Sequence, residues 1–133
     1  MLTATRTCRV VIADDVDDLR LLLRVALDAT GGFSVMAEAA DGLEAVERAR
    51  AHQPDLLVLD LSMPGLDGLE ALPLIRAQAP ETKVVVLSGF AAQRMAPAAL
   101  AAGAVAYLEK GDVYAIAAEL SGLVAGRRTL ELD

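Results

Sequence analysis

The sequence has little of what disulfide-bonded, membrane-spanning or nucleic-acid-binding proteins need. It contains one cysteine, Cys8, which excludes an internal disulfide and fits a reduced, cytoplasmic setting. No stretch approaches about 18 apolar residues, and the N-terminus has no apolar signal core, so we expect neither a membrane span nor secretion. The 12 basic residues are outnumbered by 19 acidic ones, and the net charge of −7 argues against nucleic-acid binding by this domain itself.

The length and composition indicate one folded domain. The chain has 133 residues and 55% of them are hydrophobic, which is enough for a normal core and too much for a disordered chain. We expect the domain to span residues 1–126. We interpret residues 127–133 as a polar C-terminal tail or the start of a linker.

Short apolar runs typical of buried strands recur along the chain, separated by segments with the periodicity of amphipathic helices. The runs lie at 9–13, 33–37, 56–60, 83–87 and 104–108. Regular alternation of such strands with helices predicts an α/β domain with a parallel sheet covered on both faces. Five units in one small domain favour the flavodoxin-like, doubly wound fold with strand order 2-1-3-4-5.

Capping residues and glycines predict where the helices begin and end. Asp17 or Asp18 is the expected N-cap of the first helix, and Gly31 ends it. Asp41 precedes a capping-box-like start of the second helix. The fifth helix is expected to end at Gly126.

Two prolines disturb this helical pattern. Pro73 and Pro97 fall inside the third and fourth helical segments, about 66–79 and 91–102. Each removes a helical N–H group and should kink or shorten its helix. We keep both helices in the prediction.

Acidic residues follow two of the apolar runs. Asp60 ends the third run, and Asp14 and Asp15 end the first. A carboxylate at the end of a buried strand has no packing use, because its burial is costly without a cation. The carboxyl ends of the first and third strands flank the switch point of the predicted fold, so the three carboxylates should meet there. Such a cluster suits a hard cation such as Mg²⁺.

Ser88 and Lys110 complete this edge of the predicted sheet. Ser88 follows the fourth apolar run and Lys110 follows the fifth. Taken alone, Lys110 could be a solvated charge, Ser88 a loop residue, and Asp14 with Asp15 an acidic helix start. Their order and their places at successive strand ends favour a shared site.

This set resembles the receiver domain of two-component response regulators, from about Arg9 to Ala125. The motif after Asp60, Met63-Pro-Gly-Leu-Asp-Gly68, belongs to the resemblance, as does Ser88-Gly89. It implies that Asp60 accepts a phosphoryl group from the phosphohistidine of a sensor histidine kinase. The chain would then be a phosphorylatable signalling domain that catalyses only its own phosphoryl transfer and dephosphorylation.

The resemblance also assigns roles to the other residues. The implied Mg²⁺ ligands are Asp15, Asp60 and the backbone carbonyl of Ser62, with Asp14 acting through water and charge. Lys110 and Ser88 would contact the phosphoryl oxygens. Tyr107 matches an aromatic position that changes rotamer with Ser88 during switching.

One departure from the family pattern concerns the residue after Lys110. Many receivers have a proline there, and this chain has Gly111, which permits a tight turn. The Tyr107–Asp112 run resembles receivers that precede LuxR-type helix-turn-helix domains, which suggests control of transcription. The implied partners are the kinase, docking near Val16 and Leu19, and a second copy bound through the fourth helix, fifth strand and fifth helix.

Three alternative functions fit the sequence less well than a phosphorylatable receiver does. A Mg²⁺-dependent phosphatase would carry a second aspartate two residues after the nucleophile, where this chain has Ser62. A pseudo-receiver would lack Asp60, the acidic pair or Lys110, and all are present. A flavodoxin would need a Ser/Thr/Gly-rich phosphate loop after the first strand, which the sequence lacks.

Overall fold

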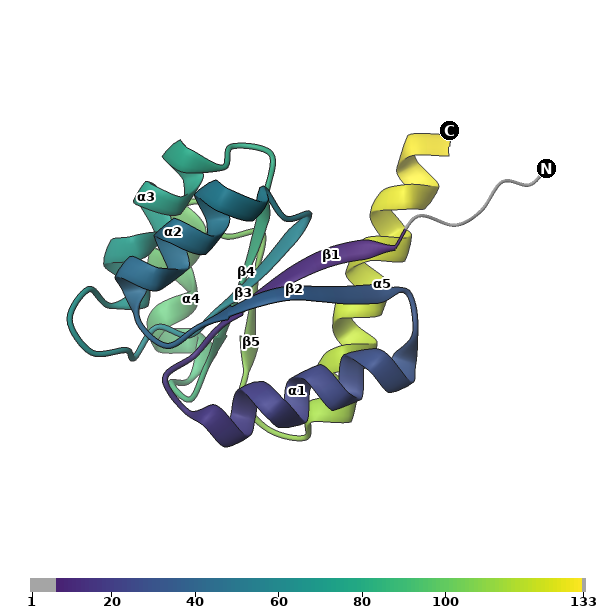
Figure 1. Ribbon diagram of the computed structural model, residues 1–133, viewed down its shortest axis with the longest axis horizontal. Coiled ribbons are helices and arrows are strands. Elements are labelled where there is room, and N and C mark those ends of the chain that lie inside the picture. Colours follow the sequence, from purple (N-terminus) through teal and green to yellow (C-terminus); the bar gives the residue numbers. More distant parts are fainter. Residues whose placement is uncertain (1–6, 133) are drawn as a thin grey trace.

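The computed structural model describes the backbone of residues 7–132 and the side chains of residues 7–125. Over these residues, five strands alternate with five helices (Figure 1). The strands are β1 (Cys8–Ala13), β2 (Phe33–Ala39), β3 (Leu56–Leu59), β4 (Lys83–Ser88) and β5 (Ala106–Glu109). The helices are α1 (Asp17–Thr30), α2 (Gly42–His52), α3 (Gly68–Gln78), α4 (Ala92–Ala101) and α5 (Val113–Leu132).

The strands form one parallel sheet in the order β2-β1-β3-β4-β5, which confirms the predicted doubly wound fold. Helices α1 and α5 cover one face, and α2, α3 and α4 cover the other (Figure 1). Each face has its own core, because side chains alternate across the strands. Val11, Leu57 and Leu59 belong to the core beneath α2 and α3, whereas Val10, Ile12 and Val58 belong to the core beneath α1 and α5.

Two glycines allow the chain to pack closely around the third strand. A Cβ atom on Gly68 would lie 2.0 Å from the backbone oxygen of Asp60, and one on Gly42 would lie 2.0 Å from the backbone oxygen of Leu66. No side chain fits at such distances without a backbone shift. Gly68 therefore fixes the start of α3 directly against Asp60, the residue that follows β3.

Two predicted helix ends, the start of α2 and the end of α1, are confirmed. Asp41 accepts a hydrogen bond from the backbone N of Glu44 and caps α2. Asp67 and Glu70 form a reciprocal capping box at the start of α3. Gly31 ends α1 with φ of 84°, a left-handed conformation that suits glycine.

Two predicted helix ends are wrong. The N-cap of α1 is Val16. Asp17 and Asp18 lie inside the first turn, where the helix dipole stabilises carboxylates. The carboxylate of Asp14 takes over part of the capping, because it accepts a hydrogen bond from the backbone N of Val16 at 2.8 Å. At the other end of the chain, α5 continues through Gly126 to Leu132, so the glycine alone does not stop it.

The helices that contain prolines form as predicted, and both are short. Helix α3 has 11 residues and α4 has 10, and each runs through its proline. They differ in packing, since four residues of α3 are buried and only Ala99 of α4 is. Among the described residues, no helix is long and apolar enough to cross a membrane.

Candidate functional site

The sheet places the predicted acidic residues at one edge. Asp14 directly follows β1, and its backbone N donates to Ala39 of β2 at 3.0 Å. Asp60 directly follows β3, and its backbone N donates to Ala13 at 2.9 Å. These hydrogen bonds extend the parallel pairing by one residue at each strand end. The two carboxylates are therefore held by the sheet itself and not by a free loop.

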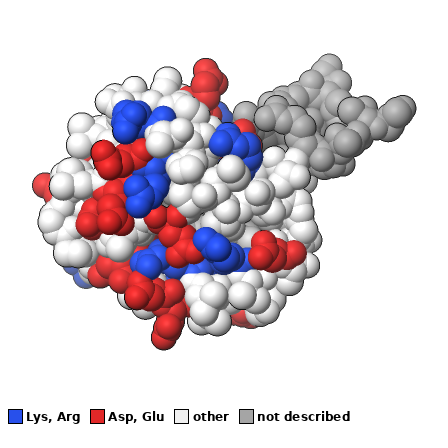
Figure 2. All heavy atoms as spheres, viewed as in Figure 1, with Lys and Arg blue, Asp and Glu red and all other residues white. Residues whose placement is uncertain are grey.

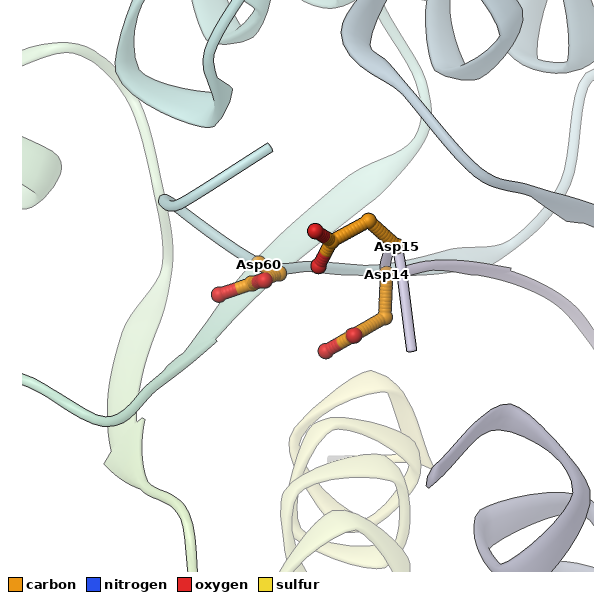
Figure 3. A group of neighbouring side chains, drawn as sticks. All are labelled: Asp14, Asp15 and Asp60. Atoms are coloured by element: carbon orange, nitrogen blue, oxygen red, sulfur yellow. The ribbon is translucent and has the colours of Figure 1, made fainter. Parts of the chain in front are cut away.

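The carboxylates of Asp14, Asp15 and Asp60 form a cluster. One oxygen from each lies within 4.8 Å of the others, and the three groups point in the same direction in Figure 3. Asp14 and Asp60 are only 3% and 2% exposed, whereas Asp15 is exposed. Carboxylate oxygens are the ligands that hard divalent cations prefer, so this cluster could hold a metal ion.

Lys110 bridges the two buried carboxylates. Its Nζ lies 2.9 Å from Oδ2 of Asp14 and 3.4 Å from Oδ2 of Asp60. The backbone N of Lys110 donates to Ser88 at 2.8 Å, which anchors the lysine to the end of β4. The side chain thus reaches the acidic cluster from the far half of the sheet.

Burial and charge shift the pKa values of this group. Burial raises the pKa of Asp60, and the negative charge of Asp14 raises it further against the opposing effect of Lys110. Burial by itself lowers the pKa of Lys110, but its hydrogen bond to Asp14 and the charge of Asp60 outweigh burial and raise the pKa above its ordinary value. Lys110 is therefore firmly charged, whereas Asp60 is harder to ionise than an ordinary aspartate.

The loop after Asp60 is fixed by buried side chains. The backbone N of Ser62 donates to Oδ1 of Asp60 at 3.3 Å. Leu61 and Met63 are 4% and 7% exposed, and they pack into the core beneath α2 and α3. The carbonyl of Ser62, an implied metal ligand, therefore lies in a well-anchored turn beside Asp60.

The predicted switch residues lie around the β4–α4 loop. Ser88 is fully buried, and its Oγ accepts a hydrogen bond from the backbone N of Phe90 at 3.1 Å. The hydroxyl of Tyr107 donates to the backbone oxygen of Phe90 at 2.7 Å. Ser88 at the end of β4 and Tyr107 of β5 therefore both hydrogen-bond to the backbone of Phe90 in the loop.

Two residues that the sequence interpretation did not single out lie beside these groups. Arg20 donates to the backbone oxygen of Asp14, and Glu109 accepts a hydrogen bond from the backbone N of Ala92 at the start of α4. The sequence carries no signal for either contact. Arg20 depends on the path of the turn between β1 and α1, and Glu109 depends on the pairing of β4 with β5.

A family model for the response regulator receiver domain matches residues 10–118. The chain therefore belongs to the response regulator receiver domain family. Over 102 residues it is 35% identical to the chemotaxis protein CheY of Bacillus subtilis, an alignment that covers 77% of this chain and 84% of that protein.

Longer relatives also match. The chain is 41% identical over 132 residues to protein-glutamate methylesterase/protein-glutamine glutaminase 5 of Myxococcus xanthus, covering 96% of this chain and 38% of that protein. It is 41% identical over 102 residues to the transcriptional regulatory protein PdtaR of Mycobacterium tuberculosis, covering 77% of this chain and 49% of that protein. This chain thus spans less than half the length of both proteins.

Solved structures agree with the fold and with the family. The response regulator domain of Thermotoga maritima CheB superposes with a TM-score of 0.81 at 33% identity, covering 96% of this chain and 99% of that chain. A LuxR-family response regulator from Aurantimonas gives a TM-score of 0.82 at 30% identity, covering 90% of this chain and 86% of that chain. The presence of LuxR-family regulators among the neighbours is consistent with the predicted subfamily.

Proposed function

We propose that this receiver domain accepts a phosphoryl group from a sensor histidine kinase onto Asp60 and relays the change to an output. The observation that carries the proposal is the buried pair Asp14 and Asp60, joined by Lys110, next to the exposed Asp15. A buried carboxylate pair bridged by one cation is an expensive arrangement, and active sites are where such arrangements gather.

In the proposed transfer, a carboxylate oxygen of Asp60 attacks the phosphorus of the donor phosphohistidine. A new P–O bond forms as the P–N bond breaks, and the imidazole leaves with the bonding electron pair. Because such reactions depend mainly on positioning and charge, Lys110 contributes by offsetting negative charge on the phosphoryl oxygens. The fixed turn after Asp60 keeps the attacking oxygen in place.

The donor set fits Mg²⁺, since it consists of carboxylate and carbonyl oxygens. When bound, the ion supplies positive charge to the phosphoryl oxygens. The residues proposed to hold it are Asp15, Asp60 and the carbonyl of Ser62, with Asp14 acting through water and through charge. Asp15 is the exposed member of the pair and Asp14 is already engaged by Lys110 and Val16, which supports this division of roles.

The proposed switch runs from Asp60 through Ser88 to the β4–α4 loop. Once phosphorylated, Asp60 offers oxygens that can accept a hydrogen bond from the Ser88 hydroxyl, and this would reorient a side chain whose Oγ accepts from the backbone N of Phe90. Movement of Ser88 and Tyr107 would alter the surface formed by α4, β5 and α5 and shift an equilibrium between two arrangements. We propose that this surface controls an output in the cytoplasm, namely transcription, either by forming a homodimer or by releasing an output domain.

Phosphorylation by acetyl phosphate with Mg²⁺ tests the central part of this proposal. Intact-mass analysis should show one added phosphoryl group on the wild type and none on Asp60→Asn. Asp67→Asn is the matched control, because asparagine can still cap α3 and the variant should be labelled like the wild type. Equal labelling of Asp60→Asn and the wild type would refute Asp60 as the acceptor.

A metal titration tests the assignment of ligands. Asp15→Ala should weaken Mg²⁺ binding more than Asp14→Ala does, because only Asp15 is proposed to touch the ion. Isothermal titration calorimetry on both variants and the wild type measures the difference. The reverse order would show that the two aspartates exchange roles.

A further inference from the structure

Arg20 of α1 is tied to three different segments. Its side chain is only 13% exposed. Nη1 donates to the backbone oxygen of Asp14 at 2.5 Å, Nε donates to the Glu38 carboxylate of β2 at 2.8 Å, and Nη2 pairs with Asp17. Figure 2 shows basic and acidic side chains side by side over α1 and β2. One planar guanidinium therefore links the end of β1, the strand β2 and the first turn of α1.

The contact with Asp14 lies where the backbone leaves the sheet. Residues 14–16 turn from β1 into α1, and the N-cap Val16 offers no side-chain cap. On one side of the turn, Oδ1 of Asp14 accepts from the backbone N of Val16. On the other side, Arg20 holds the backbone oxygen of Asp14. The direction of the Asp15 side chain follows from this turn, because Asp15 lies between the two fixed residues.

We infer that Arg20 is a positioning residue for the proposed metal site. It touches none of the carboxylate oxygens of Asp14, Asp15 and Asp60 in the described contacts, and it acts by fixing the main chain that carries the acidic pair. Partners behind the ligands of a metal site commonly set its affinity in this way. This inference rests on the proposed function, since it assumes that the acidic cluster binds Mg²⁺.

If Arg20 acted through its charge alone, its removal would change the affinity for Mg²⁺ in the opposite direction from the loss of a positioning contact. Arg20 is a cation close to an acidic pocket, so its removal should make the pocket more attractive to Mg²⁺ if only charge mattered. Loss of the hydrogen bond to Asp14 should instead loosen the turn and weaken binding. The sign of the change in affinity therefore separates the two effects.

Arg24 is a matched control within the same helix. It pairs with the other oxygen of Glu38, and its side chain is 41% exposed. Unlike Arg20, it has no described hydrogen bond to the backbone at the end of β1. Arg24→Met also removes one positive charge and one ion pair of Glu38, but it keeps the hydrogen bond from Arg20 to the backbone oxygen of Asp14.

The experiment is a Mg²⁺ titration by calorimetry at constant ionic strength. Arg20→Met should bind Mg²⁺ about tenfold more weakly than the wild type, and Arg24→Met should stay within about twofold because its charge is screened by solvent. Arg20→Lys keeps the charge but cannot reproduce the planar fork, so it should also bind more weakly. Circular dichroism in EDTA checks that each variant is folded, and Arg20→Lys carries the test if Arg20→Met is not.

The outcomes separate the inference from the proposal beneath it. Unchanged or tighter binding by the folded Arg20 variants would overturn the positioning role while leaving the metal site intact. Equal weakening in Arg20→Met and Arg24→Met would overturn it as well, because the effect would then come through Glu38. A wild-type protein that binds no Mg²⁺ would instead refute the proposed metal site itself.

Discussion

The loop after β3 and the loop after β4 leave the same edge of the sheet but are held very differently. The first carries buried Leu61 and Met63, and Gly68 packs against the backbone of Asp60. In the second, Gly89, Phe90 and Ala91 are all exposed. The helix that follows the first loop has a full capping box, whereas the helix that follows the second has no cap from its own N-cap residue.

This difference suggests a division of labour between chemistry and response. The β3–α3 loop adjoins Asp60, and phosphoryl transfer demands fixed positions for the reacting groups. The β4–α4 loop is held by a few exposed or partly exposed polar contacts, and segments held in this way can rearrange for little free energy.

Substitution of Gly68 at the start of α3 and of Gly89 in the β4–α4 loop should separate the two regions most strongly. Gly68→Ala should lower the free energy of unfolding by about 3 kcal/mol, because its Cβ would lie 2.0 Å from the oxygen of Asp60. Gly89→Ala meets no atom within 4 Å and should change stability by less than about 0.5 kcal/mol. Urea denaturation of both variants measures the two costs. Similar costs would remove the proposed contrast.

Removal of the Asp60 charge should stabilise the metal-free protein. In EDTA at neutral pH, Asp60→Asn removes a carboxylate whose ionisation is disfavoured by burial and by the nearby charge of Asp14. We expect the melting temperature to rise by a few degrees, since about 1 kcal/mol corresponds to roughly 3–6 °C in a domain of this size. Calorimetric melting of the variant and the wild type provides the measurement.

The difference in stability between Asp60→Asn and the wild type should depend on pH. Because the pKa of Asp60 is raised on folding, the folded wild type binds a proton more readily than the unfolded chain does. The wild type thus carries its full stabilisation from protonated Asp60 below the unfolded pKa of about 4 and loses it as the pH rises through the folded pKa. The advantage of Asp60→Asn should therefore shrink on acidification, and a growing advantage would contradict the assigned shift.

Glu109 should stabilise the start of α4 from the neighbouring strand. Its carboxylate accepts from the backbone N of Ala92 at 2.8 Å, in place of the cap that Ala91 cannot provide. Glu109→Ala should cost about 1 kcal/mol, as other lost N-caps do. Amide exchange should become faster in α4 and stay unchanged in α3. Glu109→Gln keeps an acceptor oxygen, so it should retain most of the protection.

Tyr107→Phe should have the smallest effect on stability. It removes an exposed hydrogen bond to Phe90 and keeps the aromatic ring, so we expect a loss of about 0.5 kcal/mol. Exchange at the backbone amides of the β4–α4 loop should increase slightly. A loss as large as that for Gly68→Ala would show that this loop is held as firmly as the one after β3.

The sequence predicts the fold well because apolar strands and amphipathic helical segments alternate regularly along the chain. The five apolar runs and the acidic strand ends fix the sheet order and the meeting of Asp14, Asp15 and Asp60. Local competition between caps is less predictable. Asp14 accepts a hydrogen bond from the backbone N of Val16, and α1 begins at Asp17, one residue earlier than an Asp17 cap and two residues earlier than an Asp18 cap would place its start. Contacts between distant segments, such as Glu109 with Ala92, have no local pattern and appear only in three dimensions.

Amide exchange of the two loops before and after phosphorylation tests the division between chemistry and response most directly. The protein is incubated with Mg²⁺ and acetyl phosphate, and Asp60→Asn under the same conditions is the control. We expect altered exchange in residues 89–109 and little change in residues 61–75, with no response in the variant. Changes confined to residues 61–75, with residues 89–109 unaffected, would contradict it.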